Sequence, residues 1–334
     1  MKVAFLTYPA AFQDVGGGEI QLLRTKEALE KKGVCVDLFD SWNSRVEAYD
    51  VIHAFSSVKD FLGLLSVAKT RKVPVVVSPI LWSDWRMTPL RHWAKWFFPA
   101  FPSGRRRILQ LADRILPNSL MEQKHISRLF AIPEQKMCVI YNAADAAFMK
   151  AAPGSFRDQY GKEPFILSVG RIEPRKNQLK MIEAVKGIPG VKLVLVGRPV
   201  TGYESYYREC VALGRGFTQW IDVLKHEEAL LASAYAACDL LVQPGWFETP
   251  ALAALEGALA GARVLLTQGG STREYFEDHV DYLNPSSVAD IRKKIRANLG
   301  RKADPALKGW VRERYSWERV AERTLDVYRE LVSR

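Results

Sequence analysis

The sequence is poor in the features that would tie it to a disulfide framework, a cysteine-based metal site or a membrane span. Its 334 residues include four cysteines, and none of them forms a C-x-x-C pair. This excludes a zinc ribbon and favours reduced thiols. No apolar run reaches the ~18 residues that cross a bilayer. Residues 1–9 are too short for the apolar core of a signal peptide. We therefore expect a cytoplasmic protein.

Several catalytic motifs are absent as well. The sequence has no D-x-D, no P-loop, no H-E-x-x-H and no G-x-S-x-G, which are signatures of metal-dependent or nucleophilic enzymes. If the ligand carries phosphate groups, basic side chains and helix N-termini must hold them in place of a divalent metal. We expect neither a bound metal nor a cofactor.

Acidic residues are scarce in the segment 69–107. Nine lysines and arginines there face a single acidic residue, Asp84, within a chain whose formal charge is +11. The same segment holds four of the nine tryptophans, Trp82 among them. Basic and aromatic residues together favour contact with an anionic membrane surface. A solvated helix face over core tryptophans and single-stranded nucleic acid are the alternatives. No nucleic-acid motif supports the last of these, so we expect no nucleic-acid partner.

The order of apolar and amphipathic segments predicts an α/β fold. Strands are expected at 2–7, 34–39, 51–55, 74–78, 114–116, 137–140, 164–169, 191–196, 240–243 and 263–267. Helices are expected at 19–32, 57–70, 119–130, 176–187, 227–238, 250–260 and 286–299. This alternation indicates parallel sheets with helices on both faces. The polar stretch 151–155 separates two such sets, so we expect two doubly wound domains, 1–155 and 156–316, that face a central cleft.

Two glutamates separated by seven residues, Glu248 and Glu256, stand beside the expected start of a helix. A short apolar strand precedes them, and Pro250 is expected in the first turn of the helix, where its missing N–H does no harm. Free N–H groups and the helix dipole at this point suit a phosphate or a sugar hydroxyl. A nucleotide sugar carries both groups.

A second strand end carries two cations. The strand 164–169 is followed by Gly170 and Arg171, and Lys176 lies at the mouth of the next helix. Two fixed cations beside a helix N-terminus can hold a diphosphate and neutralise it as a leaving group. A solvated basic turn is the alternative interpretation.

Weaker signals lie at three other strand ends. Gly16-Gly17-Gly18-Glu19 lets a ligand approach the backbone, but it is not G-x-G-x-x-G and such turns are structural about as often as functional. Gly269 and Gly270 form a similar open turn. His53 ends the strand 51–55, where a lone histidine is more often packed or hydrogen-bonded than catalytic.

Taken together, these motifs resemble family 4 of the retaining glycosyltransferases, which have the GT-B fold. The resemblance covers nearly the whole chain and rests on the segments 16–19, 50–53, 117–119, 139–142, 170–177, 248–256, 269–270 and 315–321. The pair of glutamates together with the Arg/Lys segment is its specific part. Three places depart from the family pattern. Ile80 stands where many members have a histidine, Thr249-Pro250-Ala251 replaces the usual G-F-G, and Asn142-Ala143-Ala144-Asp145 replaces the usual N-G-x-D.

The resemblance implies roles for particular residues. Arg171 and Lys176 would hold the diphosphate of the donor, Glu248 would contact the donor sugar, and Glu256 would bind the ribose. The remaining donor-binding positions implied are Gly17, Gly18, Gly170, Thr249, Pro250, Ala251 and Leu252. The positions implied for the acceptor side of the cleft are Glu19, His53, Ile80 and Trp82. A C-terminal helix within 317–334 would pack back on the first domain.

The function implied is that of a retaining, metal-independent hexosyltransferase. The donor would be a UDP-, GDP- or ADP-sugar, and the acceptor a glycan or a lipid-linked glycan in bacterial surface polysaccharide or lipopolysaccharide synthesis. The basic segment 69–107 would then touch the inner face of the cytoplasmic membrane. A sugar-nucleotide epimerase or a phosphorylase of the same fold, and a nucleic-acid-binding protein, are the alternatives.

Overall fold

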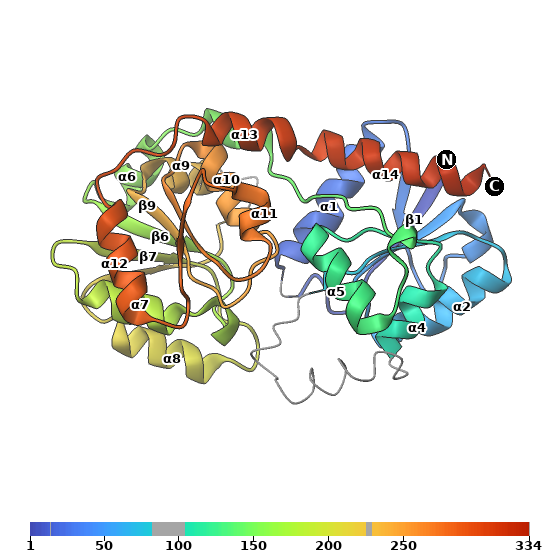
Figure 1. Ribbon diagram of the computed structural model, residues 1–334, viewed down its shortest axis with the longest axis horizontal. Coiled ribbons are helices and arrows are strands. Elements are labelled where there is room, and N and C mark those ends of the chain that lie inside the picture. The colour runs from blue at the N-terminus through green and yellow to red at the C-terminus, as the bar shows by residue number, and fades with distance from the viewer. Residues whose placement is uncertain (14, 82–103, 225–228, 334) are drawn as a thin grey trace. The chain divides into compact units, whose positions relative to one another are not determined.

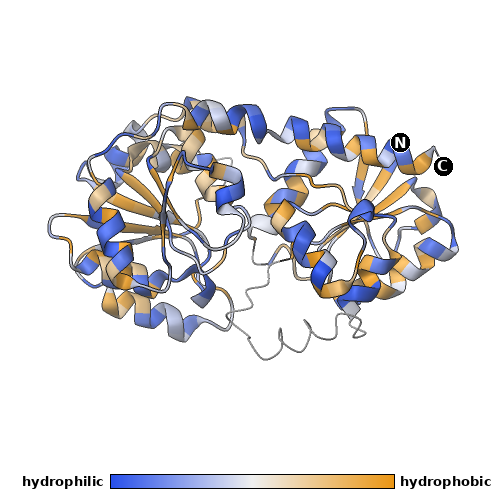
Figure 2. Cartoon of the chain, viewed as in Figure 1, coloured by the Kyte–Doolittle hydropathy of each residue, from blue (hydrophilic) through white to orange (hydrophobic). Residues whose placement is uncertain are grey.

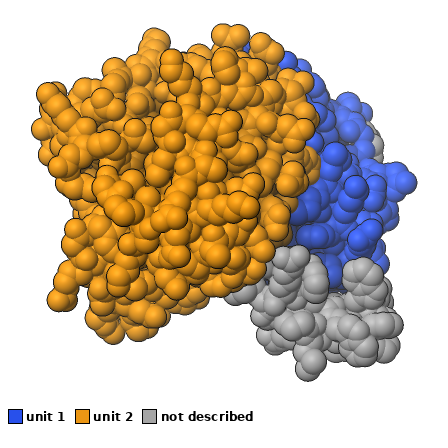
Figure 3. Space-filling model, turned by 60° about the vertical axis from the view of Figure 1, so that its left-hand side comes forward, with its two compact units in different colours: residues 1–142, 317–334 blue, residues 143–316 orange. Residues whose placement is uncertain are grey.

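The computed structural model describes residues 1–13, 15–81, 104–224 and 229–333 (Figure 1). The chain forms two compact units (Figure 3). Unit 1 comprises residues 1–142 and 317–334, and unit 2 comprises residues 143–316. Trp82 and the central part of the basic segment, 82–103, lie outside the described residues. Within those residues, no helix combines the length and the apolar character needed to cross a membrane.

Unit 1 is built on a parallel sheet with the strand order β2-β1-β3-β4-β5. Its strands are β1 (Lys2–Leu6), β2 (Cys35–Leu38), β3 (Val51–Phe55), β4 (Val75–Ser78) and β5 (Arg114–Ile115). Its helices are α1 (Gly17–Glu30), α2 (Leu62–Thr70), α4 (Gly104–Leu111), α5 (Leu120–Phe130) and α14 (Trp317–Val332). The helix α14 lies along α1 (Figure 1), and Lys32 donates to Glu322 at 2.8 Å beside that contact.

Unit 2 contains a second parallel sheet, with the order β11-β10-β9-β6-β7-β8. Its strands are β6 (Phe165–Val169), β7 (Lys192–Val196), β8 (Thr218–Ile221), β9 (Leu240–Gln243), β10 (Val264–Thr267) and β11 (Asp281–Leu283). Its helices are α6 (Gly154–Tyr160), α7 (Gln178–Lys186), α8 (Glu204–Leu213), α9 (Ala229–Ala237), α10 (Leu252–Ala260), α11 (Thr272–Phe276), α12 (Val288–Asn298) and α13 (Leu307–Arg314).

The central strands form because their apolar runs are buried on both faces, as parallel sheets require. Every residue of β3, β4, β9 and β10 is buried. Figure 2 shows these hydrophobic strands between helices whose outer faces are polar. The expected strand at 137–140 is wrong: Met137 makes only an isolated bridge to Ile115, because the chain touches the edge of the sheet there without continuing the ladder.

The topology of unit 2 fixes where its site can lie. From β6 the chain proceeds to β7 and β8 on one side, whereas β9 returns to the other side of β6. The loops that follow β6 and β9 therefore leave the sheet in opposite directions at neighbouring strand ends. Such a switch point creates a crevice at the carboxyl edge of the sheet. The two loops are 170–177 and 244–251, the segments that the sequence marks as candidates.

Candidate active site

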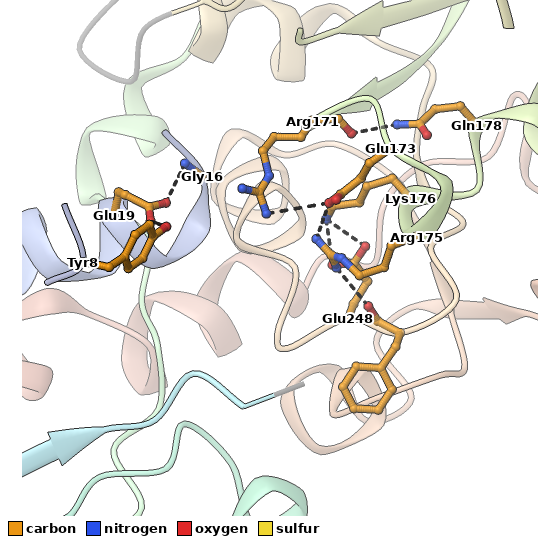
Figure 4. A network of polar contacts seen from close by, with 10 residues as sticks. Tyr8, Gly16, Glu19, Arg171, Glu173, Arg175, Lys176, Gln178 and Glu248 are labelled. Carbon is orange, nitrogen blue, oxygen red and sulfur yellow. Dashed lines mark hydrogen bonds and ion pairs between the residues drawn. The ribbon is translucent and has the colours of Figure 1, made fainter. Parts of the chain in front are cut away.

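The loops after β6 and β9 are joined by a buried ion pair between Lys176 and Glu248. Lys176 ends a short 3-10 turn, Pro174–Lys176, and its Nζ lies 2.9 Å from both Oε1 and Oε2 of Glu248. The side chains are 17% and 3% exposed, respectively. Burial lowers the pKa of the Lys176 ammonium, and the facing Glu248 carboxylate opposes that shift. The pair is thus a fixed charge assembly at the switch point, shown in Figure 4.

Three further charged residues of the β6 loop surround this pair (Figure 4). Arg175 donates from Nη2 to Glu173 Oε1 at 2.8 Å and from Nη1 to the carbonyl of Phe247 at 3.3 Å. Arg171 pairs with Glu173 at 3.7 Å and is 35% exposed. Three cations and two carboxylates therefore lie in one network, which leaves a net positive charge for an anion.

The sequence motifs do not predict that Glu173 and Arg175 belong to this network. Glu173 accepts from both arginines. The carbonyl of Arg175 accepts from the Trp246 N–H at 2.9 Å, which is a third link between the two loops. Alternation of charge sign over the segment 171–176 is the signal that could have indicated an internal network.

The backbone of Glu248 is held by the turn after β10. Its N–H donates to the Gly269 carbonyl at 3.2 Å, and its carbonyl accepts from the Ser271 N–H at 3.0 Å. Gly270 adopts φ +93°, and a Cβ there would lie 2.1 Å from the Glu248 carbonyl oxygen. This glycine-rich turn is therefore a backbone clamp on the candidate residue.

Replacing Gly270 with alanine is expected to destabilise the protein by about 2–4 kcal/mol, because positive-φ strain adds to a backbone clash. Activity should fall with it as Glu248 moves. Gly300→Ala is the matched control, since Gly300 also has positive φ (+75°) but nothing within 4 Å of its added Cβ. Urea unfolding measures both variants, and equal losses would contradict the clamp.

The helix that carries Glu256 begins later than expected. α10 starts at Leu252, Ala251 before it has φ +72°, and the Thr249–Pro250 peptide bond is cis. Pro250 thus lies in the loop, and the prediction that it occupies the first helical turn is wrong. Glu256, one turn into α10, is 4% exposed and accepts a hydrogen bond from Tyr235 at 2.7 Å.

A pocket opens beside Lys176 at the carboxyl ends of β6 and β7. It is lined by Ser168, Val169, Gly170, Ile172, Lys176, Gln178, Leu195, Val196 and Gln243. Gly170 has φ +150°, a conformation that favours glycine. A Cβ added at Gly197 would lie 2.1 Å from the Gly170 carbonyl oxygen, so that position requires glycine as well. Polar amides, one ammonium and close backbone suit a polar, anionic ligand.

In unit 1, α1 begins at Gly17, two residues before its expected start at residue 19, so Gly17 and Gly18 are its first residues. Glu19 accepts from the Gly16 N–H at 2.8 Å and from the Tyr8 hydroxyl, so it organises the glycine turn. A Cβ on Gly18 would lie 3.4 Å from Cδ1 of Ile80. Ile80 adopts φ +46°, an unusual conformation for a β-branched residue.

His53 lies in the core of unit 1, which favours the packed interpretation over a surface role. It is 1% exposed, with Nδ1 2.5 Å from the Tyr328 hydroxyl and Nε2 2.9 Å from Ser78 Oγ. Burial lowers the pKa of His53 to about 3, so the ring is neutral at physiological pH. To bind an acceptor directly, the His53 side chain would have to be exposed, and its packing in the core buries it.

Candidate metal ligands do not gather in the part of the chain that the structure describes: no group of three or more histidine, cysteine, aspartate or glutamate side chains is found there that could hold an ion.

Two family models match the chain. One, described as glycosyl transferases group 1, matches residues 155–323. The other, described as glycosyltransferase family 4, matches residues 40–148. The first range includes the loops after β6 and β9, whereas the glycine turn 16–19 lies outside both ranges.

Characterised relatives have modest identity. The chain is 26% identical over 245 residues to a D-inositol 3-phosphate glycosyltransferase of Segniliparus rotundus, an alignment that covers 68% of this chain and 54% of that protein. It is 25% identical over 316 residues to the protein of that name from Paenarthrobacter aurescens, covering 85% and 74%. The chain thus spans about half the length of the first of these relatives.

Solved structures share the whole fold. Anabaena HepE, crystallised with UDP and glucose, has a TM-score of 0.79 at 19% identity, covering 99% of this chain and 100% of that one. Sucrose-phosphate synthase from Thermosynechococcus elongatus has a TM-score of 0.78 at 19% identity and covers all of both chains. These likenesses confirm the predicted GT-B fold, with two doubly wound Rossmann-like domains.

Proposed function

The chain belongs to the glycosyl transferases group 1 family, and on that premise we propose that it is a retaining glycosyltransferase. It moves a sugar from a nucleotide-diphospho-sugar to a hydroxyl of a glycan or lipid-linked acceptor. The observation that carries the proposal is the buried Lys176–Glu248 pair at the switch point of unit 2. The Lys176 ammonium suits the diphosphate of a nucleotide sugar, and the adjacent Glu248 carboxylate can accept hydrogen bonds from its sugar hydroxyls.

In this proposal the donor binds to unit 2. Lys176 and Arg171 hold the diphosphate, whose negative charge competes with Glu248 for the Lys176 ammonium. The Glu248 carboxylate is then available to accept hydrogen bonds from the donor sugar. Glu256 accepts from the ribose hydroxyls. The loop from Thr249 to Leu252 and the close backbone at Gly170 complete the site.

The reaction breaks the bond between the anomeric carbon and the diphosphate. Negative charge grows on the leaving phosphate, where the fixed cations Lys176 and Arg171 stabilise it in surroundings of low dielectric. The acceptor hydroxyl attacks from the face that the phosphate leaves, and its proton passes to a phosphate oxygen. The configuration at the anomeric carbon is therefore retained. Neither Glu248 nor Glu256 acts as a general acid or base, and no metal is required.

The acceptor is proposed to bind through unit 1, beside Ile80. The aliphatic side chain of Ile80 offers no hydrogen bond, so the group next to it is an apolar face of the ligand. We place the reaction in the synthesis of a cell-surface polysaccharide or lipopolysaccharide, at the cytoplasmic side of the membrane.

A thermal-shift screen of UDP-, GDP- and ADP-sugars tests the proposal. A ligand that binds only the folded state raises the midpoint of unfolding, by an amount that grows with its concentration relative to Kd. We expect one nucleotide series to raise it and transfer of that sugar to follow. If none of the three series shifts the midpoint at millimolar concentration, the proposed function is wrong.

We further propose that the basic segment 69–107 contacts an anionic membrane. α2 and α4 pack against one another, and Lys136 reaches from a following turn to the Gln110 carbonyl of α4 at 2.6 Å. Burial lowers the pKa of Lys136, and the nearby cations Lys69 and Arg114 lower it further while Asp113 raises it. Lys69 and Arg71 of the segment pair with Asp113 and Glu47, so the charge that would meet a membrane comes from its other basic residues.

Replacing Arg105 and Arg107 with serine is expected to weaken binding to phosphatidylserine vesicles about 30-fold, since each basic residue near the surface contributes about 1 kcal/mol. Arg106 is kept, because its Nε donates to the Phe130 carbonyl at 3.0 Å. Replacing the exposed Lys162 and Lys293 of unit 2 removes the same charge and should have little effect. Unchanged vesicle binding, or tight salt-sensitive DNA binding by the parent, would contradict membrane contact.

A further inference from the structure

Tyr235 of α9 holds the carboxylate that the proposed function assigns to the ribose. Its ring is fully buried, and its hydroxyl donates to Glu256 Oε2 at 2.7 Å. Glu256 is 4% exposed and lies on α10, which packs against α9. A carboxylate removed from water requires hydrogen-bond partners to stay charged, and a hydroxyl donor at this distance is a strong, charge-assisted one.

The protonation state of Tyr235 suits it to this task. Burial, and next the charge of Glu256, raise the pKa of the Tyr235 hydroxyl well above its ordinary value. The hydroxyl therefore keeps its proton at neutral pH and donates to the carboxylate. A neutral hydroxyl also brings no positive charge of its own to this contact.

Packing leaves the Tyr235 ring little freedom. Phe148, in the 3-10 turn Ala146–Lys150, contacts it edge to face with ring centroids 5.7 Å apart. The residue after Glu256 is Gly257, where an added Cβ would lie 3.4 Å from Cδ1 of Tyr235 and 2.3 Å from Cδ2 of Leu241. A side chain at position 257 would therefore displace its neighbours, and glycine there lets α10 approach the ring. The hydroxyl is held at one point relative to α10.

We propose that Tyr235 is a positioning residue for nucleotide binding: it orients Glu256 so that this carboxylate accepts hydrogen bonds from the ribose hydroxyls. A carboxylate has two oxygens with about four lone-pair sites, and the contact with Tyr235 occupies one of them. The inference rests on the proposed function, because it needs Glu256 to meet a ribose. It adds a residue from a different helix that touches no substrate.

Calorimetry on Tyr235→Phe with two kinds of nucleotide tests the inference. Wild type and variant are titrated with UDP, GDP and ADP, and then with the 2′,3′-dideoxy form of each. For the nucleotide that binds, we expect Tyr235→Phe to raise Kd about tenfold, the effect of one charge-assisted hydrogen bond. We expect no difference between wild type and variant with the dideoxy form, which lacks the groups that Glu256 would bind. In turnover assays KM should rise while kcat stays within threefold.

Two further variants separate the possible outcomes. Phe148→Leu loosens the packing of the Tyr235 ring but keeps the hydroxyl, so it should lower stability without changing the ratio of the two Kd values. A tenfold loss by Tyr235→Phe that persists with the dideoxy nucleotide would overturn the inference and show a merely structural role. Glu256→Gln tests the proposed function itself. If the variant still prefers the nucleotide over its 2′,3′-dideoxy form as strongly as wild type does, the assignment of Glu256 to the ribose is wrong. A wild type that binds none of UDP, GDP and ADP would contradict the proposed function and the inference with it.

Discussion

Glu248→Gln is expected to lower turnover at least ~100-fold, the scale of losing a contact that stabilises a transition state. The substitution keeps the size of the side chain and removes its charge. It also replaces one of the two oxygens that lie 2.9 Å from Lys176 Nζ with an amide N–H₂, which cannot accept from an ammonium. The geometry of Lys176 toward the diphosphate is therefore disturbed together with the contact to the sugar.

The measurement is kcat and KM with the donor identified by the thermal-shift screen. Because Glu248 is a contact of the reacting sugar in this proposal, the loss should appear mainly in kcat. Glu183→Gln is the matched control, since Glu183 is exposed on α7 of the same unit and should tolerate the change. Turnover of Glu248→Gln within threefold of wild type would rule out the assigned role.

Lys176→Ala is expected to weaken the binding of a nucleoside diphosphate about 100-fold. The lysine supplies the least exposed cation of the network, and charge-assisted contacts to phosphate are the strong ones in such a site. The variant also leaves the buried Glu248 carboxylate without its cation, which should reduce stability by about 3 kcal/mol. Both effects follow from the same 2.9 Å contacts.

Calorimetry with the nucleoside diphosphate and urea unfolding measure the two effects separately. Lys180→Ala is the control: Lys180 lies on α7, donates to the Ser286 carbonyl at 2.6 Å and sits 5.0 Å from the centre of the Trp246 ring. It carries the same charge near the site but does not contact Glu248. Equal affinities for Lys176→Ala and wild type would count against a diphosphate site at Lys176.

The strand ends that carry the candidate site could be predicted from local sequence. Continuous apolar runs followed by Gly170 or by Pro244-Gly245 mark where a buried strand must stop. The edge strands β8 and β11 were not predicted from the sequence. They are half-buried and lack the continuous apolar run that marks a buried strand. The start of α10 was predicted two residues too early, at Pro250, because proline is common both in the first turn of a helix and in the loop before one.

The partners of the site residues could not be predicted, because pairing depends on the order of strands in the sheet. Lys176 and Glu248 are 72 residues apart in sequence, and they meet because β9 lies beside β6. The same limit applies to His53: its partners Ser78 and Tyr328 are 25 and 275 residues away, on β4 and on α14. Nothing in the strand Val51–Phe55 distinguishes a packed histidine from one that faces a ligand.

The return of the last helix to unit 1 has a consequence for recombining such proteins. The chain leaves unit 1 at residue 142 and comes back at residue 317, so the first unit is made of both ends of the sequence. A swap of residues 1–142 between relatives would place a foreign sheet against the native α14. The hydroxyl of Tyr328 would then face the residue that the other parent carries at position 53, in place of His53 of its own chain. A hybrid that changes acceptor preference must therefore inherit its first 142 and its last 18 residues from the same parent.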